Sequence, residues 1–235
     1  MHSPIARWPV LLLAAAALAS PARAQMVSAR MHAAYGTNLL FSPGTDLRSS
    51  PGRTGHVGVQ ASIGRPGGRV AFVPALRMGQ HAFRTRMAYR VHFTTVRSQF
   101  DLDLAVGLRQ MSGTVWHIGG FIGRATKVTN RIEQRSDDRS FPRYPLTTLS
   151  DRLYDRDQFG ALLGLQVPLD ERHRWSLDLM LRYHFTPLVN ADQHVALVHR
   201  PPQLVTSTVT RPATLTVGIG FRFAGPDPAP AKAMD

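Results

Sequence analysis

The chain has 235 residues, of which 43% are hydrophobic, and this is enough for one domain of ordinary size. It contains no cysteine, so disulfide bonds are excluded as a source of stability. The formal charge of +13 comes almost entirely from arginine, since Lys127 and Lys232 are the only lysines. Such a charge fits nucleic acid, anionic lipid headgroups or lipopolysaccharide phosphates, and a bias toward arginine codons would produce it without any function.

The N-terminal segment predicts export. The apolar run from Val10 to Ala19 follows the basic Arg7 and has about half of the ~20 residues that a membrane-spanning helix needs. Alanines at positions 22 and 24 then fit cleavage by signal peptidase before Gln25. We therefore predict a signal peptide over residues 1–24, with a buried N-terminal helix as the alternative. Export argues against a nucleic-acid partner.

After Gln25 the hydrophobic residues recur with a period of two, between clusters of Gly, Pro, Asn and Asp. This pattern predicts an all-β protein. The expected strands are residues 29–40, 55–64, 69–82, 91–110, 114–126, 157–167, 174–186 and 213–223.

Three segments alternate most clearly: residues 100–110, 176–185 and 214–223. One face is apolar and carries Leu102, Leu104, Val106, Leu108, Leu177, Leu179, Leu181, Tyr183, Phe185, Leu215, Val217, Ile219, Phe221 and Phe223. The opposite face is polar or small and includes charged residues in each segment. Alternation alone does not distinguish a membrane barrel with its apolar face outward from a soluble protein with that face inward.

The lengths of the connections favour the membrane barrel. Long and short segments alternate in the order 41–54, 65–68, 83–90, 111–113, 127–156, 168–173 and 187–212. Outer-membrane barrels have short periplasmic turns and longer external loops. We therefore predict an eight-stranded antiparallel up-and-down transmembrane β-barrel over residues 25–223, in the bacterial outer membrane, with both termini periplasmic. A soluble secreted β-barrel is the rival.

Aromatic residues near the expected strand ends fit the two interfacial girdles of such a barrel. They are Tyr35, Phe41, Phe72, Phe100, Trp116, Phe159, Trp175, Tyr183, Phe185 and Phe221. The Pro-rich residues 224–235 predict a disordered periplasmic tail.

The ordered strands resemble those of the PorT-like outer-membrane β-barrel domains. The similar stretches are Val73 to Gln80, Leu102 to Arg109, Gly119 to Gly123, Gly160 to Gly164 with Leu179 to Tyr183, and Val217 to Phe223. The sequence departs from the family pattern at Ala75, where Glu is frequent, and at Ala105, where the family has Pro. The resemblance implies an outer-membrane barrel, in a family that includes an accessory component of protein secretion. It also implies an insertion signal at Gly218, Phe221 and Phe223 for the outer-membrane insertion machinery.

If the charged face lines the lumen, it brings together a mixed set of arginines and aspartates. They are Arg77, Asp101, Asp103, Arg109, Asp178, Arg182 and Arg222. The interior of an eight-stranded barrel is just wide enough for side chains to fill it. We therefore predict a charge network that plugs the lumen, with a narrow anion path as the alternative.

Catalytic and metal-binding motifs are not recognisable. His184 with Asp178 or Ser176, and His81, are the candidates for an outer-membrane enzyme. His194 and His199 lack carboxylate companions at a useful spacing. The glycines of residues 64–68 fit a tight turn better than a phosphate loop. We expect no enzyme activity, no cofactor and no metal.

These features lead to three hypotheses about function. The first is a non-enzymatic barrel with a structural or accessory role in the cell envelope, in protein secretion or in surface interaction. The others are a lipid-modifying enzyme or protease, and a small passive pore. The expected partners are outer-membrane lipid, lipopolysaccharide and other envelope proteins, and the last two are expected to bind outer loops such as Lys127 to Arg156, whose charges are mixed in sign.

Overall fold

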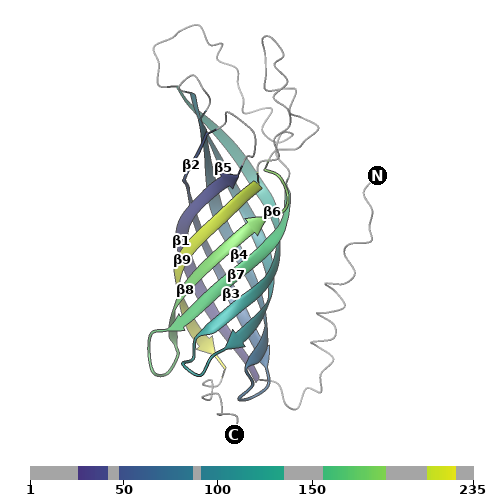
Figure 1. Ribbon diagram of the computed structural model, residues 1–235, viewed down its shortest axis with the longest axis vertical. Coiled ribbons are helices and arrows are strands. Elements are labelled where there is room, and N and C mark those ends of the chain that lie inside the picture. The colour runs from purple at the N-terminus through teal and green to yellow at the C-terminus, as the bar shows by residue number, and fades with distance from the viewer. Residues whose placement is uncertain (1–25, 42–47, 87–90, 135–155, 189–210, 226–235) are drawn as a thin grey trace, which may run out of the picture.

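The computed structural model describes residues 26–41, 48–86, 91–134, 156–188 and 211–225. These residues form nine β-strands, which Figure 1 labels along the chain. The strands are β1 (Met26–Phe41), β2 (Arg48–Ser50), β3 (Gly52–Gly64), β4 (Val70–Arg86), β5 (Val91–Arg109), β6 (Val115–Gln134), β7 (Asp157–Pro168), β8 (Trp175–His184) and β9 (Arg211–Ala224). No helix among the described residues is long and apolar enough to cross a membrane.

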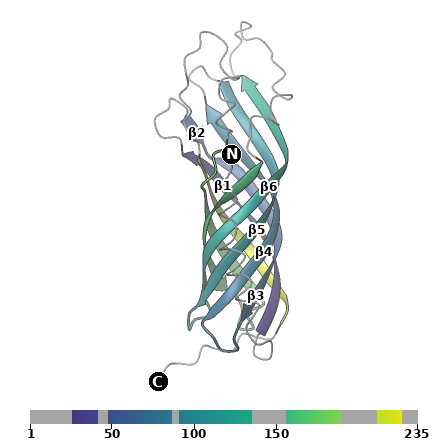
Figure 2. The same ribbon diagram turned by 90° about the vertical axis from the view of Figure 1, so that its right-hand side faces the viewer.

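The strands close into one antiparallel barrel, seen from two sides in Figures 1 and 2. Apart from the short β2, strands that follow one another in the sequence pair, β1 also pairs with β9, and the pairing of β4 with β5 completes the ring. The short β2 pairs with β4 just beyond the end of β3, so β2 and β3 form one side of the same hairpin, interrupted at Pro51. The barrel wall therefore has eight strands, which confirms the predicted fold.

The two ends of the barrel differ. One end, called the turn end, carries the short connections 65–69, 110–114 and 169–174, together with Met26 and Ala224 at the ends of the first and last strands. Gly67 and Gly113 have positive φ angles in two of these turns, a conformation that glycine adopts without strain. The other end, called the loop end, is where the strands lead into residues 42–47, 87–90, 135–155 and 189–210 (Figure 1).

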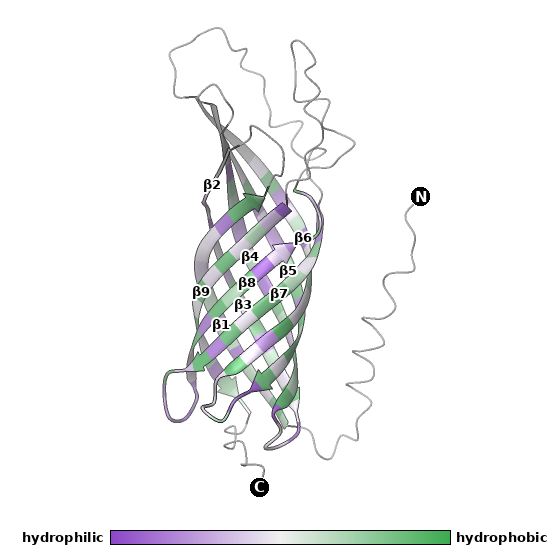
Figure 3. Ribbon diagram, viewed as in Figure 1, coloured by the Kyte–Doolittle hydropathy of each residue, from purple (hydrophilic) through white to green (hydrophobic). Residues whose placement is uncertain are grey.

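The apolar face of each strand points outward. Along β9, Leu215, Val217 and Ile219 are each about half exposed, whereas Thr214 and Thr216 are buried. The same alternation holds along β5 and β8, and Figure 3 shows it as alternating colours along the strands. Polar side chains therefore fill the interior, the reverse of a soluble barrel, and apolar side chains cover the outer wall.

Toward the loop end, β4 and β6 extend further than the sequence predicts. β4 continues to Arg86 and β6 to Gln134, so Lys127 to Gln134 belongs to a strand and not to the loop expected there. These extensions pair with each other through β5, with Phe83 opposite Thr95 and Val91 opposite Gln134. Pairing with β5 therefore allows strand structure where the apolar alternation has ended.

The ends of the predicted domains lie largely beyond the described residues. The expected signal peptide, the remainder of the 127–156 loop and almost all of the Pro-rich tail lie there, as do His194 and His199. Ala224, the first residue of the predicted tail, still pairs with Ala29 as the last residue of β9.

Aromatic side chains group at both ends of the outer wall. Toward the loop end, the rings of Phe41, Tyr183, Phe185 and Phe159 follow one another, with centroids 5.9 to 6.5 Å apart. At the turn end, the rings of Trp175 and Phe221 lie 4.8 Å apart. Such girdles mark the two interfaces of a membrane-spanning barrel.

Candidate functional site in the barrel lumen

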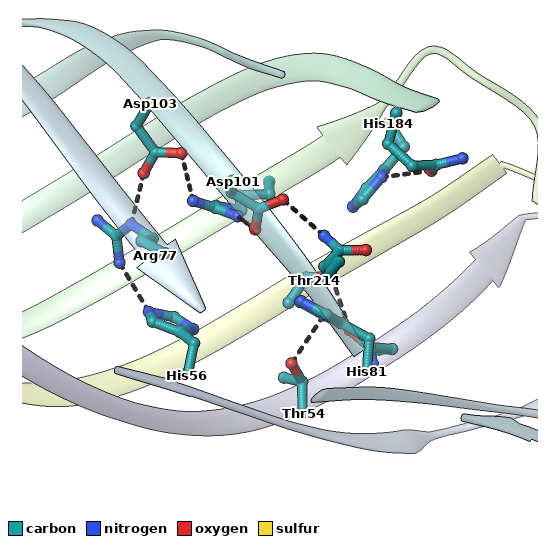
Figure 4. Close-up of polar contacts among 12 residues, drawn as sticks. Thr54, His56, Arg77, His81, Asp101, Asp103, His184 and Thr214 are labelled. Atoms are coloured by element: carbon teal, nitrogen blue, oxygen red, sulfur yellow. Dashed lines mark hydrogen bonds and ion pairs between the residues drawn. The ribbon is translucent and has the colours of Figure 1, made fainter. Parts of the chain in front are cut away.

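The centre of the lumen holds a network of two arginines and two aspartates, called here the central network. Arg182 on β8 donates to Asp101, at 2.6 Å, and to Asp103, both on β5. Arg77 on β4 donates from Nε to the other oxygen of Asp103, at 2.5 Å. All four residues are at most 5% exposed. Figure 4 shows these contacts crossing the space between the strands.

The position of β8 in the ring explains how Arg182 contacts carboxylates on the opposite wall. β8 is four strands away from β4 and three away from β5, so it lies on the opposite side of the barrel. The long guanidinium side chain of Arg182 therefore reaches across the lumen to carboxylates on the far wall. The two positive and two negative charges balance, as a buried charged cluster requires.

The period-two geometry of β5 supplies both carboxylates from one face of one strand. Asp101 and Asp103 are separated by the outward Leu102, so both point inward. Glycine makes room beside them: a Cβ added at Gly123, which pairs with Asp101, would lie 2.1 Å from the Asp101 Oδ1 atom. The amide of Gln99 completes this side by donating to the same oxygen at 2.8 Å.

Histidine and phenylalanine side chains flank the central network. Arg77 donates to Nε2 of His56 at 2.7 Å, and the His56 ring lies edge-on to that of His32, with centroids 5.6 Å apart. On the other side, the guanidinium of Arg182 lies 4.9 Å from the centre of the Phe121 ring. The network is therefore enclosed by rings as well as by backbone.

A second ion pair lies nearer the turn end. Arg30 on β1 binds Asp178 on β8, and it also donates to the hydroxyl of Ser176 at 2.7 Å. Gly220 lies between these strands on β9, and a Cβ there would lie 1.7 Å from the Arg30 Nη2 atom. Glycine at position 220 is thus required for Arg30 to reach Asp178.

Toward the loop end, beside the buried Arg97, the contacts join histidine, amide and hydroxyl side chains. His81 contacts the Thr54 hydroxyl at 2.9 Å, His184 contacts the Gln158 side-chain oxygen at 2.9 Å, and Thr214 donates to Asn38 at 2.7 Å. Figure 4 shows His81 and His184 at this level of the lumen. Beyond them, Leu40, Phe83 and Leu188 form an apolar cluster.

The structure separates the seven predicted lumen charges into groups. It brings Arg77, Asp101, Asp103 and Arg182 together, whereas Asp178 binds Arg30, which the sequence analysis did not single out. Arg109 and Arg222 line the turn-end opening, and Arg222 donates to the carbonyl oxygen of Arg172 at 2.6 Å. Arg30 was missed because β1 lacks strict alternation around it, although its position two residues before His32 places both on one face.

The catalytic alternatives are not assembled in the described residues. Ser176 and Asp178 contact Arg30, whereas His184, on the same strand, contacts Gln158 and packs at right angles to the Phe121 ring. His81 contacts Thr54 and no carboxylate. The described residues also include no group of three metal-ligating side chains. Within this part of the chain, neither histidine has the acid partner that a hydrolytic triad uses.

Four features together define the class of this protein. They are the closed antiparallel wall, the outward apolar surface, the two aromatic girdles and the short turns at one end. They are the features of bacterial outer-membrane β-barrels, in which closure leaves no unpaired backbone facing lipid. This agrees with the predicted location.

Comparison with known proteins finds similar solved structures, but it does not show a family for this chain. No family model and no curated protein matches the chain, so the PorT-like resemblance stays a prediction. The crystal structure of Neisserial surface protein A has 15% sequence identity and a TM-score of 0.47, covering 84% of this chain and 99% of that one. Ail, the attachment invasion locus protein of Yersinia pestis, has 10% identity and a TM-score of 0.42, with coverage of 85% and 99%. The outer membrane protein OprG from Pseudomonas aeruginosa has 10% identity and a TM-score of 0.37, with coverage of 85% and 96%. The class assignment rests on the sheet and surface of this chain.

Proposed function

We propose that this protein is a non-enzymatic, non-conducting barrel with a structural or accessory role in the cell envelope. The observation that carries the proposal is the central network, in which Arg182 crosses the lumen to Asp101 and Asp103. Side chains that meet across an eight-stranded barrel fill its interior and leave no continuous water path. A structural role also fits a central network whose two arginines and two aspartates balance one another.

Conductance measurements test the non-conducting state. The purified full chain is inserted into planar lipid bilayers, and current is recorded over a range of voltages. We expect no discrete conductance steps. Reproducible single-channel steps from a monomeric, heat-modifiable preparation would overturn this part of the proposal and favour the passive pore.

The proposed partners of the outer wall are membrane lipid and lipopolysaccharide. Toward the loop end, the outward positions include the exposed arginines Arg53, Arg84, Arg124 and Arg211. Guanidinium groups bind phosphates with two parallel hydrogen bonds, so arginines next to the apolar wall suit the phosphates of lipopolysaccharide. Within this proposal, the outer-membrane insertion machinery recognises the last strand through Gly218, Phe221 and Phe223, and other envelope proteins bind at the loop end.

A deletion strain tests the envelope role. We expect increased sensitivity to detergents and to large antibiotics, restored by the wild-type gene. Restoration by Arg182→Met, at equal protein level, would show that the intact barrel wall is sufficient and that lumen chemistry is not needed. An unaltered envelope in the deletion strain would count against the proposal.

The enzyme alternative rests on the buried His184 and His81. Lipid A from strains with and without the protein is compared by mass spectrometry, and the purified protein is incubated with peptide substrates. We expect identical lipid A spectra and no cleavage. A modification that disappears with His184→Gln or His81→Gln would replace the structural proposal with the enzyme.

A further inference from the structure

The outer wall of β3 to β6 changes from apolar to polar toward the loop end. These four neighbouring strands form the side of the barrel that faces the viewer in Figure 2. One outward row across β4, β5 and β6 is apolar and consists of Leu76, Leu102 and Ile122. A second outward row, four residues further along β4, is polar and consists of Gln80, Ser98 and Lys127. The boundary between hydrocarbon and headgroups therefore crosses these strands between the two rows.

A β-bulge in β6 turns Lys127 to the outer face. Ala125 pairs with Gln99 and Lys127 pairs with Ser98, so Thr126 is an extra residue on β6 at the point where the register shifts. The Thr126 hydroxyl donates to the carbonyl oxygen of Ser98 at 3.1 Å. Strict alternation from Arg124 would place Lys127 inward, but the side chains of both are exposed. Because bulges redirect side chains, this irregularity adds a second cation to the outer wall of β6.

Two arginines on the adjoining strands face the same side as Lys127. Arg53 on β3 and Arg84 on β4 are both exposed. The side-chain amide of Asn38 donates to the carbonyl oxygens of Arg53 and Ala82, so Arg53 lies beside β4 two residues before Arg84. The three residues Arg53, Arg84 and Lys127 are called here the basic patch.

The charges of the basic patch are available to a ligand. Within the described part of the chain, no hydrogen bond or ion pair joins any of these three side chains to another residue. Arg124 differs, because its guanidinium lies 3.7 Å from the Asp157 carboxylate at the start of β7. A group of cations directly above an apolar wall is complementary to a negatively charged amphiphile, whose chains contact the wall and whose headgroup contacts the cations.

The spacing of the basic patch favours a headgroup with two phosphates. Three gaps between neighbouring strands separate Arg53 from Lys127, a distance of about 14 Å across the wall. A glycerophospholipid with one phosphate contacts one end of the patch, whereas a disaccharide with a phosphate at each end contacts both. Guanidinium forks and the lysine ammonium both bind phosphate, and Gln80 and Ser98 supply neutral groups for sugar hydroxyls between them.

We propose that the basic patch binds one lipopolysaccharide molecule of the outer leaflet. One lipid A phosphate lies at Arg53 and Arg84, the other lies at Lys127, and the acyl chains cover the apolar row below. The inference rests on the proposed function for its partner. It goes further by assigning the partner to one side of the barrel and by requiring a preference for a doubly phosphorylated glycolipid over a phospholipid.

Lipid binding to the full-length protein tests this inference. The protein is titrated in neutral detergent with lipid A, with monophosphorylated lipid A and with phosphatidylglycerol, and the bound lipid is counted by native mass spectrometry. We expect one lipid A per chain, bound about tenfold more tightly than either of the other lipids. Arg84→Gln/Lys127→Gln removes a charged donor from each end of the patch, so we expect its affinity for lipid A to fall by about tenfold or more.

The matched control is Arg65→Gln/Arg172→Gln. It loses the same charge from exposed positions in two turns at the opposite end of the barrel and should retain the wild-type affinity for lipid A. Heat-modifiable migration on a gel verifies that each variant is folded. Equal affinities for lipid A and phosphatidylglycerol, or an equal loss of affinity in the two double variants, would overturn the proposed site.

This result is separate from the test of the envelope role. Selective lipid A binding by the purified protein, together with an unaltered envelope in the deletion strain, would support the site and remove the envelope role. An altered envelope in the deletion strain, together with no selective binding, would overturn the site and leave the envelope role in place.

Discussion

At the scale of single residues, Arg182 is the side chain on which the lumen depends most. It is 2% exposed and contacts both carboxylates of the central network. Removal of one partner of a buried ion pair leaves an uncompensated charge and costs about 3–5 kcal/mol. We therefore expect Arg182→Ala to lower the free energy of unfolding by about that amount, measured by urea titration in lipid vesicles.

Arg124→Ala provides the control for this variant. Its guanidinium is 74% exposed and 3.7 Å from Asp157, and an exposed pair of this kind contributes about 0–1 kcal/mol. Equal effects of the two substitutions would contradict the buried network.

Glycine substitutions test the close approach of backbone and carboxylate. Gly123→Ala places a methyl group where Asp101 lies, so Asp101 must move away from Arg182 and Gln99. Overpacking of this kind costs about 1–3 kcal/mol, which we expect as a lower free energy of unfolding. Gly55→Ala is the matched control, because its Cβ would make only ordinary contacts, 3.6 Å from the Tyr35 ring. A stability loss in Gly55→Ala as large as that in Gly123→Ala would argue against a specific role of Gly123.

At the scale of elements, the outward face of β9 should contact lipid along its length. Val217, near the middle of β9, is 48% exposed. An arginine at the midplane of a membrane barrel costs about 2–4 kcal/mol, and one near the interface about 0–1 kcal/mol. We expect Val217→Arg to destabilise the folded barrel far more than Phe223→Arg, as measured by urea unfolding in vesicles. Similar costs at the two positions would indicate that this face is not in hydrocarbon.

The strands show how much of the fold the sequence could predict. Residues 100–110, 176–185 and 214–223 alternate without interruption, because lipid on one side and a polar lumen on the other impose opposite chemistry on successive side chains. The loop-end parts of β4 and β6 lack this pattern. Their strand structure comes from pairing with β5, a long-range effect that local alternation does not encode.

The candidate site was predictable only in part, for a similar reason. Alternation places Asp101, Asp103, Arg77 and Arg182 on inward faces, but it does not say which of them meet. That depends on the order of strands around the ring, which sets β8 opposite β4 and β5. The same order separates Arg109 and Arg222 from the central network and places them at the turn-end opening.

At the scale of the whole molecule, the barrel combines a polar interior with an apolar exterior, so its folded state requires a membrane around it. A closed sheet leaves no edge strand facing lipid, and the charges of the central network balance one another. The loop end and the turn-end opening are then the parts of the barrel outside the hydrocarbon. The proposed architecture and function therefore depend on which side of the wall faces lipid.

The most direct test of that claim uses single-cysteine variants along β9. Because the chain contains no cysteine, one spin label can be placed at each of residues 214–223 in turn. Collisions with oxygen, which is enriched in the bilayer, and with a water-soluble nickel complex are measured in lipid vesicles by electron paramagnetic resonance. We expect high oxygen accessibility at Leu215, Val217 and Ile219, and low accessibility to both reagents at Thr214, Thr216 and Gly218. The opposite phase, or no alternation with period two, would contradict the membrane-spanning barrel.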